Sequence, residues 1–316
     1  MRLLCAPLLV FTACASTPRV TLPDSVTLPM RPYVVPVVPA TAGGESFDVL
    51  LDTGAARTAF DAEDARKLGL EVDWWPFPMV LSNGLDQEWV WHRAVIDRLE
   101  LGAARFEGAS VPAFDVRGLL EEPGAMAAIV GQDFLRPLVF VVDSERREVE
   151  LVPPEQRASA LERRWPGRRW RSLDLDYVGG CPTVELDLKA GVRARMIVDT
   201  GAVFSTLPRG VLERLDTTAM GSATVSGRIG GARRSDLHVL EPVHIAGWQV
   251  AMAVPALESP KGLLGMDVLD LFPIAIDGPG KKLWIAEPEA GQEPYVETSW
   301  YEISQFGSQA PKESED

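Results

Sequence analysis

The chain has 316 residues, of which 46% are hydrophobic, so it is long enough for two modest domains that each bury an apolar core. Its 25 prolines and 27 glycines favour many short strands and turns over long helices. The formal charge of −14 argues against a nucleic-acid partner, because the phosphates would be repelled.

The first segment of the chain is typical of an export signal. Residues 1–13 carry one basic residue and then an apolar run that is too short to span a bilayer. The tetrad FTAC at 11–14 resembles a bacterial lipobox, in which the signal is cut before a cysteine that receives lipid. We expect a signal peptide over 1–13, a lipid anchor at Cys14 and a tether over 14–30. A lipid anchor would place the protein in the bacterial cell envelope, on the outer membrane or periplasmic face. Plain secretion and an uncleaved anchor are the alternatives, and loss of membrane association in Cys14→Ser would separate them from the lipid anchor.

A duplication organises the rest of the chain. The segments DVLLDTGA at 48–55 and MIVDTGA at 196–202 end in the same four residues, and their aspartates, Asp52 and Asp199, are 147 positions apart. At the same offset each half shows a strand, a glycine turn, an apolar return strand and then a short helix, expected over 61–68 and 208–215. A single Asp-Thr-Gly would be a turn more often than a catalytic group, but two copies in the same context indicate a common role. The matched positions include Val37 with Val184, Gly44 with Gly191, Thr58 with Ser205 and Leu68 with Leu215.

A second pair of segments repeats at a smaller offset. AIVGQDFLRPLVFVVD at 128–143 matches GLLGMDVLDLFPIAID at 262–277, and both place two aliphatic residues before a glycine. Each segment predicts a short helix after that glycine and then a closing strand.

The remaining segments divide the chain. Alternating residues around turn signals predict hairpins at 79–91 and 223–234. We expect an N-terminal lobe over 31–153 and a C-terminal lobe over 172–287. Between them we expect an arginine-rich linker over 154–171 whose basic residues face solvent. A specific anionic partner for this linker is the less favoured interpretation. The acidic tail over 288–316 carries aromatic residues that indicate partial docking on the body.

These motifs resemble those of the pepsin and retropepsin superfamily of aspartic peptidases, in particular bacterial retropepsin-like proteins. The matching elements are LLDTGA, IVDTGA, IVG and LLG, and the resemblance spans residues 32–285. It implies an all-β, bilobal acid protease fold made of two duplicated retropepsin-like β-barrel lobes. Because both copies lie in one chain, it also implies a monomer with internal pseudo-twofold symmetry where viral relatives form a homodimer.

The resemblance assigns catalysis to Asp52 and Asp199, one from each lobe. Two carboxylates held about 3 Å apart cannot both ionise cheaply, so they share a proton and can activate a water between them for attack on a peptide bond. No metal or other cofactor is implied. The resemblance further assigns supporting roles to the flanking loop residues, namely Thr53, Gly54, Thr200 and Gly201.

A hairpin that closes over substrate is expected in this family. The best candidate is the turn at Ser82, Asn83 and Gly84, flanked by Val80 and Trp89. Aromatic residues at alternating positions are also typical of ordinary sheet packing, so substrate specificity stays open.

Other chemistry has little support in the sequence. The three histidines are far apart and lack metal-ligand spacing, no G-x-S-x-G is present, and the glycine-rich run from Gly227 lacks the Lys-Ser/Thr of a phosphate loop. Once Cys5 leaves with the signal and Cys14 is lipidated, Cys181 has no disulfide partner, and we interpret it as buried packing. The sequence therefore predicts an aspartic-type endopeptidase acting on peptides or proteins. The alternatives are a catalytically silent peptide-binding lipoprotein and a structural envelope protein of the same fold.

Overall fold

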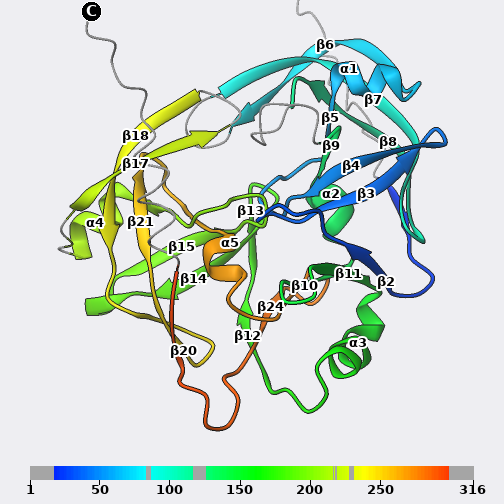
Figure 1. Cartoon of the computed structure of the whole chain (residues 1–316). Coiled ribbons are helices and arrows are strands. Elements are labelled where there is room, and N and C mark those ends of the chain that lie inside the picture. The colour runs from blue at the N-terminus through cyan, green and yellow to red at the C-terminus, as the bar shows by residue number, and fades with distance from the viewer. Residues whose placement is uncertain are drawn as a thin grey trace, which may run out of the picture.

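A computed structural model describes residues 18–82, 87–116, 126–215, 217, 219–227 and 231–298 (Figure 1). The expected signal segment and Cys14 lie outside these residues and stay predictions. Within the described part of the chain, no helix is both long enough and apolar enough to cross a membrane.

The N-terminal lobe is a β-barrel. Its sheet has the strand order β1-β8-β5-β9-β4-β3-β7-β6, and an additional pairing of β8 with β7 closes the six strands between them. The β3–β4 hairpin turns at Gly43 and Gly44, whose positive φ angles of 60° and 87° suit glycine. The strands are β1 (Arg19–Thr21), β3 (Val37–Ala42), β4 (Glu45–Leu51), β5 (Ala59–Asp61), β6 (Glu71–Ser82), β7 (Gln87–Leu101), β8 (Ala104–Phe114) and β9 (Ala128–Val130).

The described residues of this lobe form two short helices, α1 (Ala62–Lys67) and α2 (Gln132–Leu135). Asp61 caps α1 because its carboxylate accepts from the backbone amides of Glu63 and Asp64. The helix thus forms where the sequence predicts it, directly after the first Asp-Thr-Gly loop and β5.

The C-terminal lobe repeats the pattern in smaller sheets. One sheet has the order β13-β14-β15-β22, a second β16-β21-β18-β17 and a third β19-β20-β25. Its strands are β13 (Asp176–Val178), β14 (Cys181–Asp187), β15 (Arg193–Val198), β16 (Leu207–Pro208), β17 (Ala219–Gly227), β18 (Gly231–Val239), β19 (Val243–Ile245), β20 (Trp248–Ala251), β21 (Ala253–Leu257), β22 (Gly262–Leu264) and β25 (Tyr295–Glu297). The helical segments are α4 (Arg209–Leu212), α5 (Met266–Leu269) and the 3₁₀ turns η2 (Lys189–Gly191) and η3 (Glu213–Leu215).

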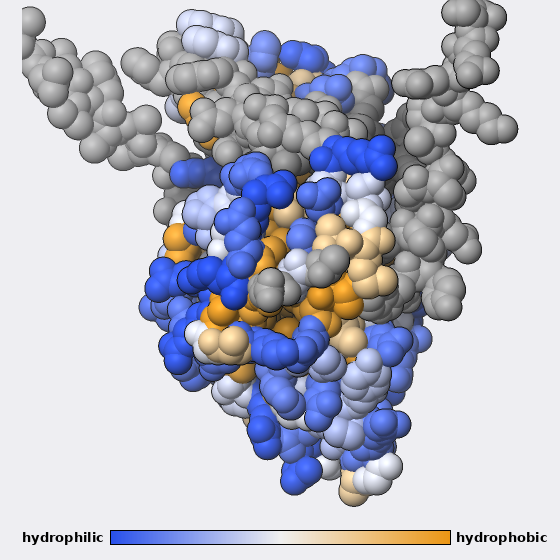
Figure 2. Space-filling view, turned by 90° about the vertical axis from the view of Figure 1, so that its left-hand side faces the viewer, coloured by the Kyte–Doolittle hydropathy of each residue, from blue (hydrophilic) through white to orange (hydrophobic). Residues whose placement is uncertain are grey.

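Figure 2 looks onto the side of the molecule that this lobe forms. Hydrophilic residues cover most of that face, and hydrophobic ones gather near its centre. A β-bridge between Thr206 and Leu263 connects the first two sheets of the lobe.

A six-stranded sheet joins the two lobes, in the order β12-β24-β23-β10-β11-β2. At its centre β10 from one half pairs antiparallel with β23 from the other, with Phe140 opposite Ile276. The duplicated halves therefore pair through corresponding strands at the centre of this sheet. The strands are β2 (Val26–Pro29), β10 (Val139–Asp143), β11 (Glu148–Val152), β12 (Trp170–Asp174), β23 (Ile274–Asp277) and β24 (Lys282–Ala286).

The arginine-rich segment differs from the expected solvated linker. After the short turn η1 (Pro154–Gln156) it forms the helix α3 (Arg157–Arg164), whose Ala160 and Leu161 pack on buried residues of the interlobe sheet. Arg164 is 9% exposed and forms ion pairs with carboxylates of β10 and β11. Some of the basic residues that predicted a solvated surface thus form ion pairs with acidic residues of the interlobe sheet.

Two further boundaries differ from the expected ones. Residues 19–21 and 26–29, expected in a free tether, are β1 and β2, and Leu28 is buried. At the other end of the chain, β25 pairs with β20 and Thr298 is buried, so the C-terminal lobe extends beyond the expected boundary at 287. The predicted partial docking of the tail is confirmed by this pairing. Strands this short carry little local signal, because distant partner strands stabilise them.

Candidate active site

Asp52 and Asp199 stand at equivalent places in the two lobes. Asp52 follows β4, and its backbone amide donates to the carbonyl of Val130 at 3.0 Å. Asp199 follows β15, and its amide donates to the carbonyl of Leu264 at 3.0 Å. In both halves the strand before the aspartate pairs in parallel with the aliphatic strand of the second repeated motif, β9 or β22. The two repeats of the sequence are therefore one structural unit that positions the loop.

The two loops meet closely enough that each aspartate occupies the side-chain space of the opposite glycine. A Cβ atom on Gly54 would lie 2.3 Å from Cγ of Asp199, and one on Gly201 would lie 2.4 Å from Cγ of Asp52. Only glycine fits at either position. The structure thus brings together both candidate catalytic aspartates and both loop glycines.

Backbone amides hold each carboxylate in its own loop. Oδ1 of Asp52 accepts from the amides of Gly54 at 2.7 Å and Ala55 at 3.0 Å. Oδ1 of Asp199 accepts from the amides of Gly201 and Ala202, both at 3.0 Å. The matching geometry leaves Oδ2 of each aspartate outside these backbone contacts.

Thr53 and Thr200 tie the two loops together. Each backbone amide donates to the hydroxyl of the opposite threonine at 3.1 Å. Each hydroxyl in turn donates to a carbonyl of the other lobe at 2.7 Å, that of Val198 for Thr53 and that of Leu51 for Thr200. Both residues are fully buried, so these bonds fix the relative position of the aspartates.

The two carboxyl groups lie within hydrogen-bonding reach of each other. Burial raises the pKa of Asp199 well above the usual range of an aspartate, and the negative charge of Asp52 raises it further. Burial also raises the pKa of Asp52, although hydrogen bonds from Asp199, Gly54 and Ala55 offset part of that effect. Both residues as a whole are half-buried. Such a pair favours a state with one proton shared between two oxygens.

A second pair of aspartates, which is absent from the residues predicted from the sequence, braces the loops. Oδ1 of Asp133 accepts from the amide of Thr58 at 2.8 Å and from its hydroxyl at 2.7 Å. Oδ1 of Asp267 accepts from the amide and hydroxyl of Ser205 at the same two distances. The available signal was the repeated Gly-x-Asp in the second motif, together with the Thr58–Ser205 match in the first.

Cys181 lies directly beside the candidate site. Its thiol is buried and donates to the carbonyl of Gly54 at 2.9 Å. Burial raises the pKa of this thiol to about 12, so it stays protonated at neutral pH. The interpretation of Cys181 as a packing residue is confirmed by this burial.

Each lobe carries a hairpin on the side of the molecule that is uppermost in Figure 1. The expected flap is the β6–β7 hairpin, in which Val80 pairs with Trp89 and Ser82 with Gln87. Asn83 and Gly84 lie outside the described residues. The β17–β18 hairpin stands at the equivalent place in the C-terminal lobe, where the sequence also predicts a hairpin. A flap role for either hairpin stays a prediction.

Comparison with known protein families adds an independent observation. A family model described as aspartyl protease matches the chain twice, over residues 38–134 and 184–268, which together make up more than half of its length. The chain belongs to the aspartyl protease family. The two matches of this aspartyl protease start just inside the first hairpin of each lobe and end in the short helices α2 and α5, so each contains one Asp-Thr-Gly loop and its bracing aspartate. A search of curated proteins found no relative of the chain.

Proposed function

We propose that this protein is an aspartic-type endopeptidase in which Asp52 and Asp199 hydrolyse peptide bonds through a shared water molecule. The observation that carries the proposal is the close approach of the two carboxylates, each within 2.3 to 2.4 Å of the Cβ position of the opposite glycine. The family match in both lobes supports the same chemistry.

The reaction needs one carboxyl group in each protonation state. The ionised aspartate takes a proton from the water as its oxygen attacks the carbonyl carbon, and the protonated aspartate donates to the developing oxyanion. Collapse of the tetrahedral intermediate then breaks the C–N bond, and the leaving nitrogen receives a proton from the pair. The raised pKa of Asp199 supports a singly protonated state above the pH at which two ordinary aspartates would both ionise.

The loop contacts give this chemistry its geometry. The amides that bind Oδ1 of each aspartate hold the carboxylates in place, while the two threonines prevent the lobes from shifting relative to each other. Such fixed positioning contributes to the rate because the reacting groups lose little freedom at the moment of reaction.

The experiment compares the parent protein with Asp52→Asn and Asp199→Asn variants on a diverse peptide mixture from about pH 3 to pH 7. We expect cleavage by the parent and loss of cleavage in both variants, with thermal unfolding measured to verify that the variants remain folded. Cleavage that survives either substitution would contradict the assignment of the pair. Binding of peptides by the parent without cleavage would favour the alternative of a catalytically silent binding protein.

A further inference from the structure

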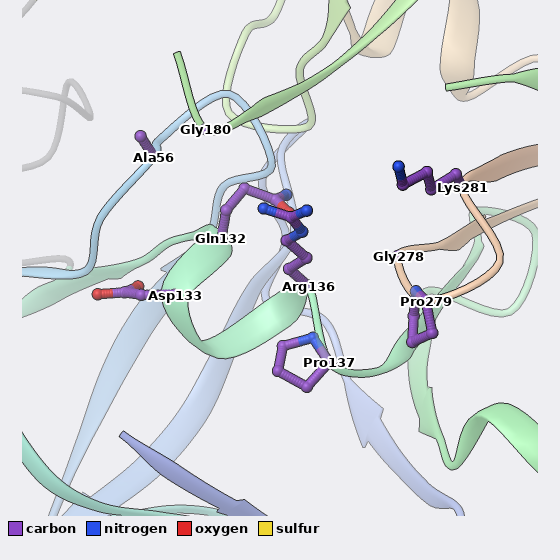
Figure 3. A pocket seen from close by; sticks show the side chains of 9 residues that line it. All are labelled: Ala56, Gln132, Asp133, Arg136, Pro137, Gly180, Gly278, Pro279 and Lys281. Atoms are coloured by element: carbon purple, nitrogen blue, oxygen red, sulfur yellow. The ribbon is translucent and has the colours of Figure 1, made fainter. Parts of the chain in front are cut away.

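A cavity of about 470 Å³ opens between the two lobes beside the candidate active site (Figure 3). The helix α2 forms one wall from the N-terminal lobe, and the β13–β14 and β23–β24 turns form the other from the C-terminal lobe. The residues that line this cavity include Ala56, Gln132, Arg136, Gly180 and Lys281.

Three of these residues connect the cavity to the Asp52 loop. Ala56 belongs to the loop itself, four positions after the aspartate. Nε2 of Gln132 donates to the carbonyl of Thr53 at 3.1 Å, and Gly180 directly precedes Cys181, whose thiol contacts Gly54. These three links place the cavity directly beside the loop that carries Asp52.

Two cations face the cavity without a carboxylate partner. Figure 3 shows the guanidinium of Arg136 and the amine of Lys281 on opposite sides of the same space, with the carboxylate of Asp133 directed away from it. Asp133 is engaged by Thr58, and no ion pair joins Arg136 or Lys281 to an acidic residue in the described part of the chain. Unpaired cations facing one cavity are notable in a protein whose net charge is −14.

Arg136 is held in position by an aromatic ring. Its Cζ atom lies 4.1 Å from the centroid of the Tyr177 ring, a cation–π contact that orients the guanidinium without neutralising its charge. The Tyr177 hydroxyl oxygen is buried and has no hydrogen-bond partner among the described residues. Burial raises the pKa of Tyr177 to about 12, so the hydroxyl keeps its proton. The residue that orients Arg136 therefore also carries a buried donor without an acceptor among the described residues.

The other half of the duplication lacks these features. Arg147 occupies the turn position that corresponds to Lys281, and both have positive φ angles, 55° and 50°. Arg147, however, donates to the carbonyls of Arg31 and Tyr33, and the position corresponding to Arg136 is Asp270. A role in holding the fold together would be expected in both halves, so the asymmetry favours a role in binding.

We infer that this cavity binds a carboxylate of the substrate, so that the enzyme prefers peptides with an anionic group on one fixed side of the scissile bond. The inference rests on the proposed function for its substrate class. A guanidinium binds a carboxylate through two parallel N–H bonds, and Lys281 adds a charge from the opposite wall. The carboxylate can come from an acidic side chain or from the C-terminus of the peptide.

The experiment measures binding separately from turnover. The Asp199→Asn protein is immobilised and incubated with a random decapeptide mixture, one half amidated at the C-terminus and the other half with a free carboxylate. Retained peptides are identified by mass spectrometry. We expect peptides that bear the carboxylate to be enriched about tenfold, and we expect this enrichment to disappear when Arg136→Gln and Lys281→Gln are added.

The arms of the experiment distinguish the two sources. Enrichment of Asp and Glu in both halves of the mixture identifies a side-chain carboxylate, while enrichment confined to free C-termini identifies the terminal one. A matched control is Arg19→Gln, which removes an exposed charge on β1 and should leave the enrichment unchanged. If the double variant does not fold, Lys281→Gln alone reports the same effect at an exposed position, and Lys281→Arg should retain the preference.

The outcomes separate this inference from the proposed function. Equal retention of acidic and neutral peptides, an absence of retention, or a preference that survives loss of both cations would overturn the inference, whether or not the parent protein cleaves. Selection of acidic peptides by the Asp199→Asn protein, together with no cleavage by the parent, would support the cavity and contradict the peptidase.

Discussion

Gly54 and Gly201 are the residues on which the approach of the two loops depends most directly. A methyl group at Gly54 would collide with the carboxylate of Asp199, and the backbone of both loops is held by the threonine bonds, so neither side can move away freely. We expect Gly54→Ala to lower kcat/KM on the order of 10²-fold, because a displacement of about 1 Å at reacting groups has that effect. Peptide cleavage assays on the folded variant measure it.

Gly210 provides the matched control for this substitution. It lies in α4, has no neighbouring atom within 4 Å of an added Cβ, and does not have a positive φ angle. Gly210→Ala should therefore leave activity unchanged and stabilise the protein by up to about 1 kcal/mol. Equal activity of Gly54→Ala and Gly210→Ala would show that the loops do not need the close contact.

The raised pKa of Asp267 makes the free energy of unfolding depend on pH. Burial raises its pKa from 3.8 to about 6, so the folded protein binds more protons than the unfolded chain between these values. Its contribution to the free energy of unfolding is therefore fully present below pH 3.8 and is lost as the pH rises through about 6. The loss amounts to about 3 kcal/mol, from two pKa units at about 1.4 kcal/mol each.

Asp267→Asn should remove this dependence while Oδ1 still accepts from Ser205. We expect the difference in unfolding free energy between variant and parent to shift by about 2 kcal/mol in favour of the variant between pH 4 and pH 7, because the carboxyl of the unfolded chain is already partly ionised at pH 4. Urea denaturation at both pH values measures the difference, in which all other titrating groups cancel. A difference that does not change with pH would contradict the raised pKa.

At the scale of single residues, the repeated Asp-Thr-Gly motif explains which residues of the candidate site could be predicted from the sequence. Asp52, Asp199 and their threonines and glycines stand next to one another in sequence, so the duplication revealed all six. Asp133 and Asp267 were missed because their role depends on contacts with Thr58 and Ser205, which are 75 and 62 positions away. The cavity cations were missed for the same reason, since Arg136 and Lys281 come from different lobes.

At the scale of secondary-structure elements, local patterns predicted the hairpins and the short helices. Turn glycines and alternating residues act within a few positions, so these elements carry their own signal. β1, β2 and β25 have three or four residues each and exist because β8, β11 and β20 pair with them. The local sequence of helix α3 predicts a solvated linker because its acidic partners lie on other elements, β10 and β11.

Arg164 tests whether α3 fastens the interlobe sheet. Its side chain pairs with Asp143, which is 2% exposed, and with Glu150, which is 3% exposed. Arg164→Met would leave these carboxylates with fewer compensating charges, and we expect a loss of about 3 kcal/mol in unfolding free energy. Lys67→Met, which breaks exposed pairs on α1, should change it by no more than about 0.5 kcal/mol. If Arg164→Met and Lys67→Met change the unfolding free energy equally in urea denaturation, α3 does not stabilise the interlobe sheet.

At the scale of the whole molecule, the duplication in one chain has a kinetic consequence. Viral retropepsins, which this chain resembles, assemble the site from two copies, so their activity per subunit falls when dilution separates the copies. Here the pairing of β10 with β23 brings both loops together within one chain of 34.5 kDa. The same arrangement permits the residues of the two halves to differ. They do differ at the cavity that Arg136 and Lys281 face.

We therefore expect the cleavage rate per mole of protein to stay constant over about a thousand-fold dilution, because no association step contributes to the site. Sedimentation at the same concentrations should give the mass of a single chain throughout. The Asp52→Asn and Asp199→Asn proteins supply the control, since mixing them should restore no activity when each chain contains both halves of its own site. Recovery of activity in that mixture, or a rate per mole that falls with dilution, would indicate that two chains exchange lobes to build the active pair.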